Sequence, residues 1–160
     1  MAFGGDTTIL FLPGLRDHVE DHWQTHAARE IPGAVTVAPV AAERLSRARQ
    51  VAALDAALRA IPGEVVVVAH SAGCLIMVHW ALAPTRTIRA ALLVTPADIE
   101  NPLPAGYPEP GSLKDGGWLK PDTMLVLEES SDAALDLPVG FALDDRREYG
   151  AAAVHFLSLI

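Results

Sequence analysis

A run of four valines that leads into a serine flanked by small residues constrains this chain more than any other feature. Residues 65–75 read VVVVAHSAGCL, so a strand-forming run passes directly into a segment of helical character. In a nucleophile elbow, a serine occupies a strained turn between a strand and a helix, and the residues two positions away must be small. Ala69 and Gly73 meet this requirement around Ser71. The pattern therefore predicts an α/β fold with Ser71 as a nucleophile at the carboxyl edge of a sheet.

The alternative interpretation of Ser71 is that its hydroxyl only caps the following helix. Capping requires neither small residues on both sides nor a preceding valine strand, so we favour the nucleophile. The elbow would place the Ala72 N–H and the positive end of the helix beside Ser71 Oγ, where an oxyanion needs donors. Pro13 and Gly14 follow the first predicted strand. In the turn that they form, we predict that the Leu15 N–H is the second donor of the oxyanion hole.

Short apolar runs alternate with longer segments of helical pattern along the whole chain. Most of the runs are apolar on both faces, which is typical of parallel strands covered by helices on each side. The predicted strands are residues 8–12, 34–38, 65–69, 88–95, 123–127 and 151–157, and the predicted helices are residues 21–30, 45–60, 72–83 and 140–149. This order predicts a single three-layer α/β/α domain over residues 1–160, with a doubly wound, mainly parallel sheet of about six strands.

Composition narrows the classes of partner and compartment. The chain carries 12 Lys and Arg against 20 Asp and Glu, a formal charge of -8, which disfavours nucleic acid and anionic membrane as partners. Cys74 is the only cysteine, so the sequence predicts no disulfide framework and a reducing, cytoplasmic compartment. We find no signal-peptide pattern and no apolar run of the roughly 18 residues that a membrane span needs.

Histidines and the cysteine offer other sites, which we do not favour. His18, His22 and His26 recur every four residues and could chelate zinc from one helix face. The sequence implies no carboxylate or cysteine as a further ligand, and a tetrahedral zinc site needs three or four converging ligands. No nucleotide-binding fingerprint is present, so we expect neither a metal nor a cofactor. Strand alternation predicts that His70 points away from Ser71 Oγ and is structural. Cys74 is expected to be a small buried apolar residue.

Five segments, taken together, carry a resemblance. They are FLPGL at 11–15, EDHWQTH at 20–26, VVVVAHSAGCLIMVHWA at 65–81, AALLVTPADIENP at 90–102 and MLVLEESSDAA at 124–134. In these segments the chain resembles the family of small serine hydrolases related to retinoblastoma-binding protein 9 and YdeN. The resemblance implies a compact α/β-hydrolase that acts through Ser, Asp and His. Our own prediction is hydrolysis of a small-molecule ester or related acyl substrate without a cofactor. The resemblance also implies that His22 and Trp23 pack near the mouth of a pocket.

Two departures from the family pattern affect the other catalytic residues. The family's acid follows the fifth strand in a Ser-Ser-Asp-Asp-Pro context, and the corresponding stretch here is SSDAA at 130–134. The resemblance therefore implies Asp132 as the acid, with Asp136 as the alternative; Asp132 as a plain loop or capping residue is equally open. The family's histidine follows the last strand in a Gly-His turn. His155 comes about four to six residues earlier, within the predicted strand, which is over ~10 Å away at ~3.3 Å per residue.

We therefore expect the 160-residue chain to lack the family's final histidine turn and C-terminal helix. Its esterase activity should then be near background, unless His155 or an N-terminal histidine acts as the base. Apolar side chains of the last strand should also favour self-association. A hydrolase-like module that binds a ligand or protein without catalysis is the alternative function. A flavodoxin-like binding domain is a third, which the elbow disfavours.

Overall fold

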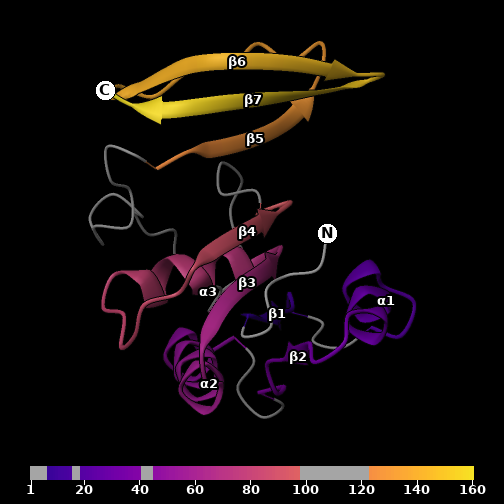
Figure 1. The fold of residues 1–160 in the computed structure, drawn as a ribbon, viewed down its shortest axis with the longest axis vertical. Coiled ribbons are helices and arrows are strands. Elements are labelled where there is room, and N and C mark those ends of the chain that lie inside the picture. The colour runs from indigo at the N-terminus through magenta and orange to yellow at the C-terminus, as the bar shows by residue number, and fades with distance from the viewer. Residues whose placement is uncertain (1–6, 16–18, 41–44, 98–122) are drawn as a thin grey trace. The chain divides into compact units, whose positions relative to one another are not determined.

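The computed structural model describes residues 7–15, 19–40, 45–97 and 123–160 (Figure 1). The chain divides into two compact units, Met1–Leu113 and Lys114–Ile160, which are treated separately below. That both belong to one domain remains a prediction. Within the described residues, no helix is long and apolar enough to cross a membrane.

The first unit is built on a parallel sheet of four strands in the order β2-β1-β3-β4. The strands are β1 (Thr7–Leu12), β2 (Val35–Thr36), β3 (Glu64–His70) and β4 (Ala90–Val94). Leu10 of β1 pairs with Val35 on one side and with Val67 on the other, and all three strand pairs are parallel. This part of the predicted α/β architecture is confirmed, although only two residues of the predicted strand 34–38 join the ladder.

Helices cover both faces of this sheet (Figure 1): α1 (Trp23–Glu30), α2 (Arg47–Ala60) and α3 (Ala72–Ala81). Helix α1 packs on the face that presents Ile9, Phe11 and Val68, through Ala27 and Ala28. Helix α3 lies on the other side of the sheet, where it contacts β1, β3 and α2. Because side chains alternate along a strand, the buried residues Leu10 and Val67 belong to this second face. The first unit is thus doubly wound.

A polar link joins α2 to α3. Asp55 of α2 accepts hydrogen bonds from Trp80 Nε1 of α3 (3.0 Å), from Arg59 Nε (2.8 Å) and from the Thr85 hydroxyl. These donors lower the pKa of Asp55, with Thr85 contributing most. The Trp80 side chain is only 2% exposed, so its indole N–H would have no water to bond if Asp55 were absent.

The strand order creates a switch point at the carboxyl ends of β1 and β3. The chain leaves β1 toward α1 on one face and leaves β3 toward α3 on the other, so the connections diverge at the carboxyl ends of these neighbouring strands. In open α/β sheets, ligands bind at such a switch point. The segments that follow the two strands here contain Gly14 and Ser71.

The second unit is an antiparallel sheet in the order β5-β7-β6. Its strands are β5 (Leu125–Ser130), β6 (Phe141–Tyr149) and β7 (Ala152–Leu159). The predicted parallel sheet of about six strands is therefore not confirmed, since four strands are parallel and the last three form their own antiparallel sheet. Strand β7 is paired along both edges. Self-association through its apolar side chains remains a prediction.

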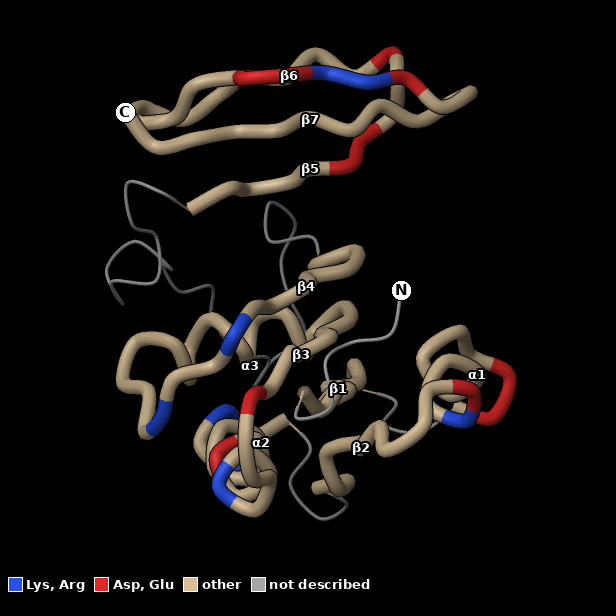
Figure 2. The backbone as a smooth tube through the Cα atoms, in the orientation of Figure 1, with Lys and Arg blue, Asp and Glu red and all other residues tan. Residues whose placement is uncertain are grey.

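The predicted helix at 140–149 is wrong, because this segment is strand β6. Gly140 and Gly150 adopt positive φ (96° and 64°) and form turns at its two ends, so the chain folds back as a hairpin onto the apolar strand β7. The charged run of β6 (Figure 2) suits a strand. Arg147 pairs with Asp145 and Arg146 with Glu148, and residues two apart share a face only in a strand.

Candidate active site

Ser71 occupies a strained turn between β3 and α3. Its backbone has φ 53° and ψ −121°, in a region that residues other than glycine rarely adopt. Its backbone N–H donates to the Val94 carbonyl oxygen (3.1 Å), which ties the turn to the neighbouring strand β4. The Ser71 side chain makes no capping hydrogen bond to α3. The capping interpretation is therefore wrong, and the predicted strand–turn–helix geometry is confirmed.

Gly73 allows α3 to begin against the end of β1. A Cβ on Gly73 would lie 2.6 Å from the Leu12 carbonyl oxygen and 2.7 Å from that of Pro13. These are backbone atoms at the end of a buried strand, so neither can move aside without shifting the sheet. Only glycine fits at this position of the elbow.

The loop after β1 lies directly against Ser71. A Cβ on Gly14 would be 3.2 Å from Ser71 Cβ and 3.6 Å from His70 Nδ1. Ser71 and the His70 ring therefore border the same point of the loop at Gly14. The loop is thus where an oxyanion donor is expected.

The two predicted oxyanion donors, the Ala72 and Leu15 N–H groups, lie in different surroundings. Ala72 is the first residue of α3 and is buried, so its N–H is one of the donors that a helix start leaves without an intrahelical acceptor. Leu15 follows Gly14 and is partly buried. The roles of the Ala72 and Leu15 N–H groups in an oxyanion hole remain predictions.

Two imidazoles and an indole ring cluster beside the elbow. The rings of His22 and His70 meet edge to face with centroids 4.5 Å apart, and Trp23 lies 5.7 Å from His22 and 6.0 Å from His70. Burial lowers the pKa of His70, and the nearby His22 lowers it further, so His70 is neutral at pH 7. His22 Nδ1 accepts the Gln24 backbone N–H (3.3 Å) as the cap of α1.

Gln24 is a positioning residue whose role the sequence did not reveal. Its buried side-chain Nε2 donates to the Val68 carbonyl oxygen (3.0 Å) and to that of Leu12 (3.4 Å). One amide thus joins α1 to both β1 and β3, the strands on either side of the switch point. The only signal in the sequence was its place in the HWQ segment, which carried the resemblance but no chemistry.

Cys74 does not compete with Ser71 as a nucleophile. Its Sγ donates to the Val94 carbonyl oxygen (3.5 Å), and burial raises the pKa of the thiol to about 11. At neutral pH the thiol is protonated, and a thiol is a far weaker nucleophile than a thiolate. Cys74 is 1% exposed, as expected for a small buried apolar residue.

The histidines considered for zinc do not converge where they are described. His26 Nε2 pairs with Asp21 Oδ1 (3.0 Å) at the surface, and His22 belongs to the ring cluster beside His70. His18 lies outside the described residues. Within residues 7–15, 19–40, 45–97 and 123–160, no group of three His, Cys, Asp or Glu is placed to hold a metal ion.

Asp132, the predicted acid, belongs to the second unit. It follows β5 in a turn, is exposed, and its backbone N–H donates to Ser130 Oγ (3.4 Å). No described side chain donates to its carboxylate, and no helix begins there for it to cap. Asp136, the alternative, is exposed as well. The role of either carboxylate toward Ser71 remains a prediction.

His155 lies in the middle of β7, as expected, and is 3% exposed. Its Nε2 accepts a hydrogen bond from Arg146 Nε (3.2 Å), so the neutral ring carries its proton on Nδ1. Nδ1 has no partner among the described residues.

Comparisons with known proteins agree with this geometry. The model of a family described as serine hydrolase matches residues 9–111. One similar solved structure is the crystal structure of a putative YdeN-like hydrolase from Pectobacterium atrosepticum, with 29% sequence identity and a TM-score of 0.53. The match covers 59% of this chain and 51% of that one, so the chain spans about half the length of that hydrolase. Among curated proteins, none matches the chain.

Proposed function

Because the chain belongs to the serine hydrolase family, we propose that it hydrolyses carboxylic esters or related acyl compounds with Ser71 as the nucleophile. The conformation of Ser71 carries this proposal. A non-glycine residue at φ 53° costs free energy, and such strain is retained mainly at functional sites. The Ser71 hydroxyl makes no cap bond that would explain its place at the helix start.

In the proposed reaction, Ser71 Oγ attacks the carbonyl carbon of the substrate and the carbonyl π electrons move onto oxygen. The Ala72 and Leu15 N–H groups stabilise the resulting oxyanion. The serine proton passes to a histidine, which returns it to the leaving alcohol as the ester C–O bond breaks. Water then attacks the acyl-serine by the same route and releases the carboxylic acid and free Ser71.

The proton acceptor limits the rate in this proposal. His22 and His26 already bond with Gln24 and Asp21, and no described residue accepts a hydrogen bond from Ser71 Oγ. An unassisted serine hydroxyl is a poor nucleophile, so we expect slow turnover. Asp132, or Asp136 in its place, is proposed as the carboxylate that orients the catalytic histidine.

Hydrolysis of p-nitrophenyl butyrate by matched serine variants tests the proposal. Ser71→Ala should abolish the protein-dependent rate. Ser46→Ala is the matched control, because Ser46 Oγ accepts the Arg49 N–H and caps α2 in the ordinary way. It should lose a little stability and keep the rate. Equal rates for wild type and Ser71→Ala would contradict the proposal.

A second candidate function is binding of an ester or acid without turnover. The absence of a described imidazole hydrogen-bonded to Ser71 Oγ favours it. Under this alternative, an ester would bind to the chain with measurable affinity, and no release of p-nitrophenol would depend on Ser71.

A further inference from the structure

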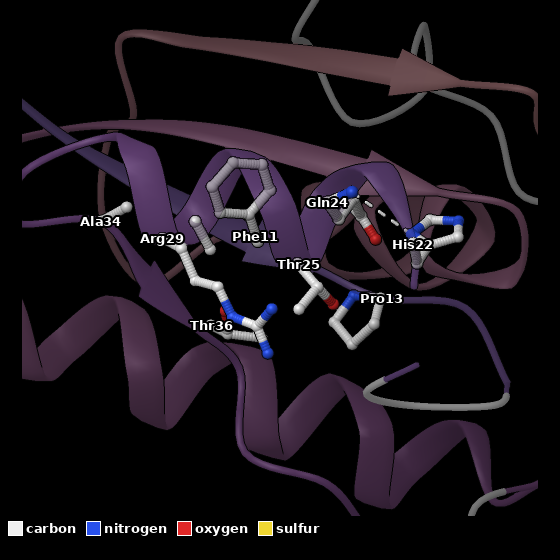
Figure 3. A pocket seen from close by; sticks show the side chains of 9 residues that line it. Phe11, Pro13, His22, Gln24, Thr25, Arg29, Ala34 and Thr36 are labelled. Carbon is white, nitrogen blue, oxygen red and sulfur yellow. Dashed lines mark hydrogen bonds between the residues drawn. The ribbon is translucent and has the colours of Figure 1, made fainter. Parts of the chain in front are cut away.

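A pocket of about 220 Å³ lies between α1 and the strands β1 and β2 (Figure 3). Phe11, Pro13, Ala28 and Ala34 give it apolar walls, and the rest of the lining is polar: His22, Gln24, Thr25, Arg29 and Thr36. Small-molecule sites likewise combine apolar walls with polar groups that orient the ligand. The volume is below the ~300 Å³ of pockets for drug-sized ligands, which limits the occupant to a short chain.

The pocket borders residues that contact the elbow, although no residue from 69 to 73 lines it. Pro13 lines it, and the next residue, Gly14, lies against Ser71 Cβ. His22 lines it as well, and the His22 ring packs on His70, the residue before the nucleophile. A ligand in the pocket therefore has one end beside the residues that border Ser71.

Arg29 is distinguished by its lack of a partner. Arg29 is exposed, and among the arginines that the structure describes it is the one whose guanidinium has no hydrogen bond or ion pair. The described arginines with partners are Arg47, Arg49, Arg59, Arg86, Arg89, Arg146 and Arg147. In a chain with 20 acidic residues against 12 basic ones, a guanidinium at a pocket wall without a carboxylate is available for an anion from solution.

The position of Arg29 on α1 also matters. Arg29 is in the last turn of α1, where any positively charged side chain interacts favourably with the helix dipole. It comes seven residues after His22, about 10 Å along the helix axis. In Figure 3 the guanidinium group points toward the space between Thr36 and Pro13. Stabilisation of the helix dipole does not require that the guanidinium N–H groups point into the pocket.

We propose that this pocket binds the acyl chain of the substrate and that Arg29 selects short acyl chains that end in a carboxylate. The inference rests on the proposed function for the placement of the acyl carbonyl beside Ser71. The chain methylenes contact Phe11 and Ala28, and the terminal carboxylate accepts hydrogen bonds from Arg29. A volume of about 220 Å³ equals the share of about seven water molecules, which suits a chain of about six carbons.

Binding to the Ser71→Ala variant tests this inference without any chemistry. Monomethyl adipate and methyl hexanoate have equal acyl length and differ in whether a carboxylate or a methyl group ends the chain. Isothermal titration calorimetry at low salt should show monomethyl adipate binding at least 10-fold more tightly, as expected for hydrogen bonds between charged groups.

Variants of the two arginines separate recognition from helix stability. Arg29→Gln should remove the preference for monomethyl adipate, and Arg29→Lys should retain the helix charge and only part of the preference. Arg89→Gln is the matched control, because Arg89 pairs with Glu64 at the amino end of the sheet and should keep the full preference. Equal affinity for the two esters, or a preference that survives Arg29→Gln, would overturn the inference. Failure of Ser71 to react with a phosphonate would instead refute the proposed function and leave this binding intact.

Discussion

The backbone of Gly73 lies so close to β1 that a Cβ at this position would be 2.6 Å from the Leu12 carbonyl oxygen. This contact joins the start of α3 to the end of a strand 61 positions earlier in the chain. It fixes where α3 begins relative to β1 and therefore the place of Ser71 at the turn between β3 and α3.

Gly73→Ala should consequently separate α3 from β1. We expect a loss of about 1–3 kcal/mol in the free energy of unfolding, which is typical of overpacking, measured by urea denaturation. Gly33→Ala is the control, because nothing lies within 4 Å of its Cβ position and only the positive φ (76°) is strained. It should cost about 1 kcal/mol. An equal effect of the two substitutions would show that the contact with β1 is unimportant.

The link between α2 and α3 makes a second prediction. Asp55→Ala should lower the free energy of unfolding by about 1–3 kcal/mol, since it leaves the buried Trp80 indole N–H unpaired. Asp55→Asn should lose less, because the amide oxygen still accepts from Trp80. Arg59→Ala removes only the exposed ion pair with Asp55 and should cost at most about 1 kcal/mol. If all three variants unfold at the same urea concentration, Trp80 does not depend on this bond.

A pH dependence follows from His70. Burial, with the nearby His22, lowers the pKa of folded His70, whereas the unfolded chain has an ordinary histidine pKa of about 6.5. Below about pH 6.5 the unfolded state therefore binds a proton that the folded state resists, and stability falls as the pH falls. His70→Phe should reduce this loss between about pH 7 and pH 5. His26→Gln, an exposed control, should leave this loss of stability unchanged. If His70→Phe also left the loss unchanged, His70 would not be its cause.

The elbow could be predicted from the sequence because its requirements are local. A valine strand, small residues around Ser71 and an apolar helix all occur within residues 65–81. The reason for Gly73 was only partly foreseen. We expected crowding within the turn, and the closest atoms are carbonyl oxygens of Leu12 and Pro13, which depend on how β1 packs against α3.

Other features depend on tertiary pairing and could not be read from local patterns. The charged segment 144–148 is compatible with an exposed helix as well as with a strand. It forms a strand because turns at Gly140 and Gly150 allow it to pair with β7. The buried Gln24 amide bonds to carbonyl groups that belong to two different strands. The sequence likewise could not predict that the Arg29 side chain lacks a partner, because the fold decides which charged side chains lie near it.

Reaction with a fluorophosphonate, followed by intact mass and peptide mapping, tests the central claim that Ser71 is the nucleophile. We predict a single phosphonyl adduct on Ser71 that forms slowly in excess reagent, because no described residue accepts the Ser71 proton. The adduct should be absent from Ser71→Ala and unchanged in Ser46→Ala. An adduct on another residue, equal reaction of Ser71→Ala, or no adduct on Ser71 after exhaustive treatment would contradict the account.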